Sequence, residues 1–344
     1  MKLEKTRRLM EAGICDKRFD AFALSVKKDG EETILTSPGT DADTYFDIAS
    51  MGKVLVTASL ILRAIGEGKL APGDTLDRFF DVPEECKKIT VQQMLTHTSG
   101  IVRVNIPQWI ADAGRDATAR FIAENPLAFV PGTQYEYSCN AYILLGFIAE
   151  QIYGAPLDAL FDRYIKLPLG LTRSRFNIAL EEPNAAVCYK RRDPGYYRVD
   201  DENAYSLRGI AGNGAQFFTL TDVNRYMDAV ERKSEKLYAS SLYDLAEKNH
   251  TPGAGYAESR GWGWLYVDGK YRQTGRLFPE GSIGHCGHTG CSMFMNRQAG
   301  IRVVLLSNTT RFLNMKNDFH GYDYSLTMKM REEFHNAIAD DLGV

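Results

Sequence analysis

One segment restricts the folds open to this chain more than any other. It runs from Met51 to Ile65 (MGKVLVTASLILRAI), is mostly apolar and shows no turn signal before Gly66. An apolar run of this length predicts a helix that is buried on nearly all sides. Such a helix needs a sizeable core around it, and the 344-residue chain, with 44% hydrophobic residues, has the composition to form one.

Strand patterns lie near both ends of the chain. Ala21 to Lys27 alternates like a strand, Lys28-Asp29-Gly30 is a turn, and Glu32 to Thr36 returns, which predicts a β-hairpin. Residues 291–296 and 301–308 are also strand-like, and 322–342 has the pattern of an amphipathic helix. Helical patterns lie in between, at 91–96, at 106–125 with a break, and at 141–153, 157–165 and 220–248.

This distribution of elements predicts an α+β fold. An antiparallel sheet is expected from the N- and C-terminal segments, flanked by helices, with a largely helical region inserted between them. We expect one two-lobed domain over residues 1–344, with one lobe from 1–49 plus 255–344 and a mostly helical lobe from 50–254. Residues 181–203 are the expected long loop.

Charge and composition exclude several classes of function. The formal net charge is −3 and the basic residues are dispersed, so a nucleic acid partner is not expected. The charged N-terminal stretch lacks the apolar core of a signal peptide, and no later run is expected to span a membrane. We therefore expect a cytoplasmic protein without a membrane partner, and the oligomeric state stays open.

The cysteines and histidines give no sign of a metal centre. The six cysteines are scattered without paired zinc spacing, so we expect free thiols. The histidines form no H-x-x-x-H pair, and no carboxylate accompanies His285 and His288. No metal and no other cofactor is predicted.

Ser50 and Lys53 are the first candidates for chemistry. Three residues apart at the start of the buried helix, they share one face and come within hydrogen-bonding reach. The other positions of that face are Val56, Thr57, Leu60, Ile61 and Ala64. Lys53 is thus the only charge on an apolar stripe, where desolvation lowers the pKa of a lysine and makes it a base.

A plainer interpretation of the pair stays open at this point. Ser50 would then be a helix N-cap and Lys53 a surface residue. The spacing alone decides little, because Ser25 and Lys28 show the same S-x-x-K pattern. Only Ser50, however, lies at the positive end of a predicted helix dipole, which favours a developing oxyanion.

Five blocks in order resemble the superfamily of class C β-lactamases, D-alanyl-D-alanine carboxypeptidases and related esterases. Residues 46–62 (FDIASMGKVLVTASLIL) resemble its nucleophile segment, and 93–100 (QMLTHTSG) its L-L-x-H-T-S-G signature. Residues 135–146 resemble its second catalytic element, and 201–222 and 284–308 match two later blocks. The resemblance covers about residues 20 to 335 and implies a serine β-lactamase/transpeptidase-like fold.

The resemblance also implies roles for particular residues. Ser50 would be the acylated nucleophile, Lys53 its proton partner, and Tyr137 the phenol or phenolate that relays protons to the leaving group. A lysine ammonium next to Tyr137 is expected to stabilise the phenolate. His97, in the H-T-S-G segment, would be structural.

A further implied element is the segment that falls where the lactamases carry Lys-Thr-Gly. His285-Cys286-Gly287 takes that place, and a register using His288-Thr289-Gly290 is the alternative. The backbone N–H groups of Ser50 and His288 would form the oxyanion hole, with Gly287 allowing close approach of the substrate. Trp264, with Trp262, would wall an acyl pocket, although core packing is the other interpretation.

Two departures from the family pattern bear on the substrate. Cys139 stands where lactamases and many carboxypeptidases have the asparagine that orients an amide, and Gly52 stands where threonine is usual. With the absence of a leader, they favour an intracellular carboxylesterase-like hydrolase acting on a small-molecule ester or amide. Transfer of the acyl group to another acceptor would use the same acyl-enzyme.

Two alternative functions remain. One is amide hydrolysis by a D-amino peptidase, a carboxypeptidase or a weak β-lactamase. The other is a catalytically silent member of the family that binds a ligand through the same cleft.

Overall fold

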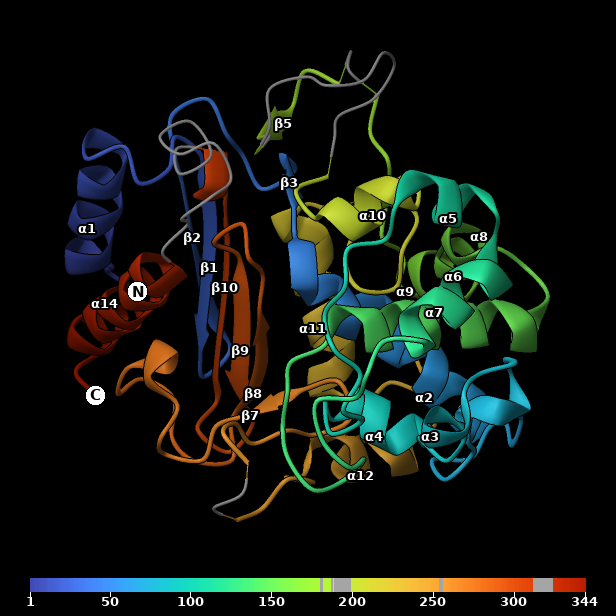
Figure 1. Ribbon diagram of the computed structural model, residues 1–344. Helices are drawn as coiled ribbons and strands as arrows, with labels where there is room; N and C mark the ends of the chain where they lie inside the picture. Colours follow the sequence, from blue (N-terminus) through green and yellow to red (C-terminus); the bar gives the residue numbers. More distant parts are fainter. Residues whose placement is uncertain (180–181, 187, 189–198, 254–255, 312–323) are drawn as a thin grey trace.

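The computed structural model describes residues 1–179, 182–186, 188, 199–253, 256–311 and 324–344 (Figure 1). The strands are β1 Phe22–Lys28, β2 Glu31–Thr36, β3 Tyr45–Asp47, β4 Arg175–Phe176, β5 Ala185–Ala186, β6 Gln216–Phe218, β7 Leu265–Tyr266, β8 Ile283–Cys286, β9 Ser292–Asn296 and β10 Ile301–Ser307. The α-helices are α1 Glu4–Cys15, α2 Ser59–Gly66, α3 Glu84–Lys87, α4 Val91–Leu95, α5 Gln108–Asp112, α6 Arg115–Ala123, α7 Cys139–Tyr153, α8 Leu157–Phe161, α9 Leu167–Leu169, α10 Glu202–Ser206, α11 Leu220–Glu231, α12 Tyr243–Glu247 and α14 Tyr324–Leu342. The 3₁₀ and π turns are η1 Ala49–Met51, η2 Lys53–Ala58, η3 Leu76–Arg78, η4 Asp162–Lys166, η5 Ser240–Leu242 and η6 Arg272–Thr274.

The main sheet joins the two ends of the chain. Its strand order is β2-β1-β10-β9-β8-β7, and every neighbouring pair is antiparallel. The predicted hairpin is β1 and β2, and β1 pairs in turn with β10, so that Leu24 faces Leu305. A smaller sheet has the order β4-β6-β3-β5. The α+β fold with a sheet from the N- and C-terminal segments is confirmed.

The two faces of the main sheet support two separate cores. Leu24 and Val303 point into a core that includes Phe334 and Ile338 of α14. Ala23 and Val304 point the opposite way, into the larger core that contains the helices of the insertion. This alternation follows from the period of two along a strand. Figure 1 shows α1 and α14 on one side of the sheet and the inserted helices on the other.

The predicted buried helix is present, but it is not regular. It begins as the 3₁₀ turn η1, continues as the π-helical η2 and becomes α-helical only in α2. The carbonyl of Val54 accepts from Ser59 Oγ at 2.9 Å and lies 3.3 Å from Tyr226 Oη. These hydroxyls compete with the usual i to i+4 ladder, which accounts for the wider turn.

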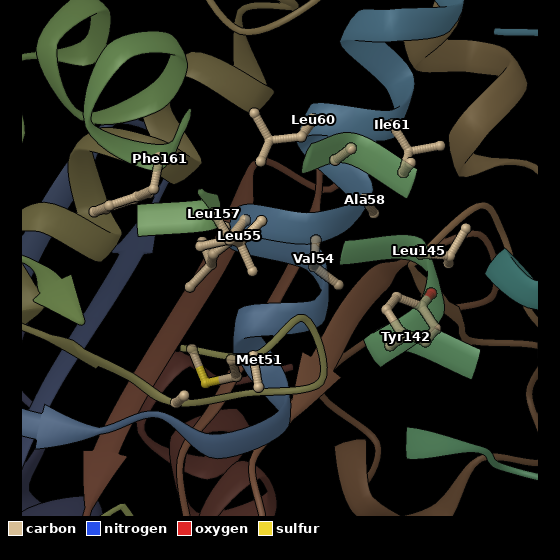
Figure 2. Close-up of a cluster of buried hydrophobic side chains, with 14 of the residues drawn as sticks. Met51, Val54, Leu55, Ala58, Leu60, Ile61, Tyr142, Leu145, Leu157 and Phe161 are labelled. Carbon is tan, nitrogen blue, oxygen red and sulfur yellow. The ribbon is translucent and has the colours of Figure 1, made fainter. Parts of the chain in front are cut away.

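The core packs around this helix. Figure 2 shows Val54 and Leu55 among side chains that include Tyr142 and Leu145 of α7 and Phe161 of α8. All six residues of η2 are buried, including Lys53. The buried setting predicted for this segment is confirmed.

The length of that helix departs from an expectation. Ala49–Gly66 is long and apolar enough to cross a membrane, contrary to the prediction that no run approaches this length. This segment is 78% buried inside the protein, as in the core helix of a folded domain. Helix α7 and the helical segment from Leu157 to Leu169 are long and apolar enough to cross a membrane only when taken together, and they are bent by 74° relative to each other.

Other expected boundaries need correction or stay predictions. The single helix expected over 220–248 is wrong, because α11 ends at Glu231 in a Schellman motif. Lys233 is left-handed (φ 51°), and Ser234 N–H donates to Ala229 O at 2.9 Å. The break within 106–125 falls at Gly114 (φ 99°). The two lobes stay a prediction, and much of the loop expected at 181–203 lies outside the described residues.

Candidate active site

Ser50 is placed by an unusual backbone turn. It lies in η1, directly after Ala49, whose φ of 46° is in the left-handed region that alanine seldom adopts. The N–H of Ala49 donates to Asp47 Oδ1 at 2.8 Å. On the other side, a Cβ on Gly214 would lie 2.9 Å from the Ala49 carbonyl oxygen. The surrounding structure thus holds the turn that presents the Ser50 hydroxyl.

Lys53 lies beneath Ser50 with three partners. Its Nζ is 3.0 Å from Ser50 Oγ, 2.6 Å from the carbonyl oxygen of Asn213 and 3.4 Å from Cys139 Sγ. The side chain is fully buried, and burial lowers the pKa of Lys53, although Cys139 and Asp201 oppose the shift. The neutral amine is therefore more accessible than in an ordinary lysine.

Tyr137 reaches the same serine from the turn before α7. The N-cap of α7 is Ser138, whose Oγ accepts from Ala141 N–H at 3.1 Å. Lys53 Nζ lies 5.1 Å from the centre of the Tyr137 ring, and the Ser50 side chain is a hydrogen-bonding neighbour that acts to lower the pKa of Tyr137. Ser50 and Tyr137 stay partly exposed, so the reactive oxygens lie nearer the surface than the lysine.

The protonation of Tyr137 differs from the sequence argument. A lysine ammonium was expected to favour the phenolate. Instead, burial raises the pKa of Tyr137 well above its ordinary value, and Cys139 adds to this effect. A phenolate in surroundings that exclude most of the water is costly, so the site favours a neutral phenol beside a lysine whose own pKa is lowered.

His97 supports the tyrosine turn. Its Nδ1 accepts from Ser138 N–H at 3.1 Å, and its ring centre lies 4.4 Å from that of Tyr137 and 5.0 Å from that of Tyr142. Burial lowers the pKa of His97 well below its ordinary value, and Arg260 adds to the shift. A neutral imidazole therefore lies beneath the candidate site.

The Gly287 segment meets the serine turn directly. His285 is on β8, with its ring centre 6.3 Å from that of Tyr137, whereas His288 is in the following turn. A Cβ on Gly287 would lie 2.4 Å from the carbonyl oxygen of Ile48, so only glycine fits there. In the alternative segment, His288-Thr289-Gly290, the hydroxyl of Thr289 donates a hydrogen bond to the carbonyl oxygen of Asp47 at 2.7 Å.

The His288 imidazole is half exposed, and its Nε2 lies 3.6 Å from Asp200 Oδ2. Its ring stacks on that of Tyr324 at 5.7 Å between centres. Trp264 is 1% exposed and belongs to the larger core, while a Cβ on the preceding Gly263 would meet Ala58 at 2.6 Å. The oxyanion role of His288 and the pocket role of Trp264 stay predictions.

The two departures have local physical contexts. Cys139 is the first residue of α7, almost buried, and its Sγ faces the lysine. At Gly52 a Cβ would lie only 1.7 Å from Gln216 Oε1, so the glutamine of β6 occupies the space that a side chain at position 52 would need. Gly52 and Gln216 therefore fit each other.

Three residues near the site were not predicted as part of it. Asn213 gives its carbonyl oxygen to Lys53, and its own Nδ2 donates to Asp201 Oδ1 at 2.9 Å. Arg260 places its guanidinium carbon 5.4 Å from the centre of the Tyr137 ring. Asn213 and Asp201 lie in a recognised block without an assigned residue, and no sequence signal marks Arg260. Among the described residues, no group of three or more His, Cys, Asp or Glu side chains could hold a metal.

Comparison with known proteins identifies the family. A sequence model of the family described as Beta-lactamase matches residues 6–320. The chain belongs to the Beta-lactamase family. It is therefore a member of a family of serine hydrolases that act on small molecules, with the β-lactamase/transpeptidase-like fold described above.

Relatives within and around this family carry different names. An Escherichia coli O157:H7 protein provisionally named a D-alanyl-D-alanine carboxypeptidase is 28% identical over 84% of this chain and 74% of its own length. Esterase EstB of Burkholderia gladioli is 27% identical over 84% of this chain and 82% of its own. The solved structure of EstCE1, described as a hydrolase with promiscuous acyltransferase activity, aligns at a TM-score of 0.74 with 19% identity, covering 96% of this chain and 98% of that one.

Proposed function

We propose that this Beta-lactamase family member is a carboxylesterase-like hydrolase that forms an acyl-enzyme on Ser50. The observation that carries the proposal is the sharing of one hydroxyl by two proton carriers. Ser50 Oγ lies 3.0 Å from Lys53 Nζ, and the Ser50 side chain is a hydrogen-bonding neighbour that acts to lower the pKa of Tyr137. A nucleophile within reach of a base that is itself oriented by other groups is the arrangement that acyl transfer requires.

The protonation states of Lys53 and Tyr137 suit two different roles, with Lys53 as the general base and Tyr137 as the general acid. Because the pKa of Lys53 is lowered by burial, its neutral amine accepts the proton as Ser50 Oγ attacks the carbonyl carbon. Tyr137, held as a phenol, donates its proton to the leaving alkoxide and is reprotonated from Lys53. Water then attacks the acyl-enzyme by the reverse relay, which restores the serine and releases the acid.

The developing oxyanion would be bound by backbone N–H groups at the junction of two elements. We assign this role to the N–H groups of Ser50, on η1, and His288, in the turn after β8. Gly287 lets the two segments approach, since the carbonyl of Ile48 occupies the space that a Cβ at position 287 would need. Preorganised donors of this kind stabilise the tetrahedral intermediate at no reorganisation cost.

Ester cleavage is favoured over amide cleavage by the residue at position 139. The thiol of Cys139 faces Lys53. Unlike asparagine, cysteine has no carboxamide that could hydrogen-bond to an amide group of the substrate. An ester with a good leaving group needs less orientation and less protonation than an amide. The similarity to Esterase EstB is consistent with this preference.

Amide hydrolysis is the second candidate, because another relative carries a carboxypeptidase name. The substrate panel should therefore contain p-nitrophenyl butyrate, a chromogenic cephalosporin and a D-alanyl-D-alanine peptide. Faster turnover of either amide substrate than of the ester would replace the esterase proposal with this candidate.

The test compares hydrolysis of p-nitrophenyl butyrate by the native protein, Ser50→Ala and Ser25→Ala. Ser25 is a matched control: it has the same S-x-x-K spacing, but it lies on β1 and its Oγ donates to Glu32 Oε1 at 2.6 Å. On a strand, residues three apart point to opposite faces, so Ser25 and Lys28 form no catalytic pair.

We expect activity to vanish in Ser50→Ala and to persist in Ser25→Ala. Labelling of Ser50 by a fluorophosphonate, located by mass spectrometry, would identify the acyl-enzyme directly. A folded native protein that neither hydrolyses any substrate of the panel nor becomes labelled would instead be a silent, ligand-binding member of the family.

A further inference from the structure

Arg260 is a buried cation beside the proposed catalytic pair. It precedes β7, forms an isolated antiparallel bridge with Leu265 and is 3% exposed. Its guanidinium carbon lies 5.4 Å from the centre of the Tyr137 ring and 5.6 Å from that of Tyr135. Since arginine keeps its proton in proteins, this is a permanent positive charge at the site.

Among the residues that the structure describes, the hydrogen-bond and ion-pair partners of Arg260 contact only one nitrogen of its guanidinium group, Nη2. Nη2 donates to Tyr135 Oη at 2.9 Å and forms an ion pair with Glu258. Tyr135 Oη also donates to Glu258 Oε2 at 2.7 Å, which closes a three-residue network. The buried Nε and Nη1 of Arg260 have no hydrogen-bond partner in the described part of the chain. Glu258 is one-third exposed, so solvent screens its charge more than that of Arg260.

Other titratable groups also surround the pair. Around Tyr137 they are Lys53, Cys139, His97, His285, Tyr135 and Tyr324, and Asp201 also acts on Lys53. Burial lowers the pKa of both His97 and His285 well below the ordinary value, and Arg260 is the next cause for each. Both imidazoles are thus neutral, which leaves Arg260 as the fixed cation beside the pair.

We propose that Arg260 is a positioning residue whose fixed charge keeps the Lys53–Tyr137 pair in the proton-poor state that can accept the Ser50 proton. A cation placed next to two exchangeable protons disfavours the addition of a further proton. Glu258 limits this effect, and Tyr135 holds the two charges together. The inference rests on the proposed function, because it gives Arg260 a task only if Lys53 acts as the base.

The experiment is the pH profile of kcat for ester hydrolysis in the native protein, Arg260→Gln and Glu258→Gln. Loss of the cation raises the pKa of the Lys53–Tyr137 pair, so the acid limb of Arg260→Gln should move to higher pH. Loss of the carboxylate strengthens the uncompensated cation, so the limb of Glu258→Gln should move to lower pH. Each shift should be about one pH unit for charges at this separation and burial.

The opposite signs separate an electrostatic role from a structural one. A network that only supports the fold would lower activity in both variants without moving the limbs apart. Arg260→Lys serves as a conservative rescue: it keeps the charge but loses the planar fork, and its limb should stay near that of the native protein. Limbs that do not move, or that move in the same direction, would overturn the inference.

A second buried arginine controls for the loss of a buried charge. Arg302 on β10 is 4% exposed and pairs with Asp228 and Glu231, away from the groups that face Tyr137. Arg302→Gln should lower the unfolding temperature while leaving the acid limb in place. If Arg260→Gln does not fold, the shift in Glu258→Gln decides the matter.

The rate of Ser50 labelling by a fluorophosphonate, followed against pH, repeats the test without any assumption about the natural substrate. Failure of the proposed function would leave every variant and the native protein unlabelled at Ser50. Failure of this inference alone would give a labelled native protein whose profile coincides with that of Arg260→Gln.

Discussion

The amine of Lys53, in η2, lies 3.4 Å from the thiol of Cys139, the first residue of α7. Cys139 stands where the resemblance to lactamases and carboxypeptidases implies an asparagine. It leaves the base with a weak acceptor in place of an amide oxygen. Under the proposed function, this side chain favours ester over amide substrates, and exchange of residue 139 tests that role.

Cys139→Asn should raise the ratio of amide to ester turnover. The new carboxamide could pair with the amide of a substrate, a gain of one hydrogen bond that corresponds to about 3- to 10-fold in kcat/KM. The measurement compares a chromogenic cephalosporin with p-nitrophenyl butyrate. Cys139→Ser is the control, because it changes the polarity at the site without adding an amide. An unchanged ratio in Cys139→Asn would show that position 139 does not select the substrate.

Asp47 should make stability depend on pH. It is fully buried, and burial raises the pKa of Asp47 from 3.8 to about 6, against the hydrogen bonds from Asp200 and Ala49. A carboxyl group whose pKa is raised in the folded state stabilises the fold fully below pH 3.8, and this contribution is lost as the pH rises through about 6.

Asp47→Asn removes that titration. Between about pH 4.5 and about pH 8, the native protein should lose on the order of 2 kcal/mol of unfolding free energy relative to the variant. Urea unfolding of both proteins at the two pH values gives this double difference, in which the other titrating groups cancel. A difference near zero would contradict the shifted pKa of Asp47.

Ala49 should tolerate glycine and reject a β-branched residue. Its φ of 46° is easy for glycine, so Ala49→Gly should change the free energy of unfolding by no more than about 1 kcal/mol. Ala49→Val should destabilise by about 2 kcal/mol or more and displace Ser50, since valine seldom adopts this conformation. Measurements of thermal unfolding and ester hydrolysis in Ala49→Gly and Ala49→Val test this prediction. Equal behaviour of glycine and valine would show that the turn relaxes.

Gly287→Ala should reduce activity more than stability would explain. The added methyl group would meet the carbonyl of Ile48 and push β8 away from the Ser50 turn. Separation of the two N–H groups assigned to the oxyanion hole should lower kcat/KM by about 100-fold. Gly73→Ala is a matched control, because nothing lies within 4 Å of its Cβ position. Native activity in a folded Gly287→Ala protein would remove Gly287 from the site.

Much of the fold followed from local pattern. The β1–β2 hairpin, the buried helix after Ser50 and a helix break between residues 106 and 125 are fixed by periods and by turn residues within a few positions. The approach of Ser50 and Lys53 also follows locally, since three residues of helical rise bring both side chains to one face. The bounds of longer helices did not follow, because a Schellman motif centred on Lys233 ended α11 where the pattern continued.

The sequence by itself thus determined the β1–β2 hairpin, the sheet formed by the two ends of the chain, the buried helix and the Ser50–Lys53 pair. Only the tertiary structure brought Asn213, Cys139 and Arg260 to that pair, from segments 86 to about 207 residues away. It also decided the protonation that the pair favours, since the pKa of Lys53 or Tyr137 depends on how completely the surrounding chain excludes water. Spacing describes neighbours along the chain, whereas desolvation and long-range charge exist only after the chain has packed.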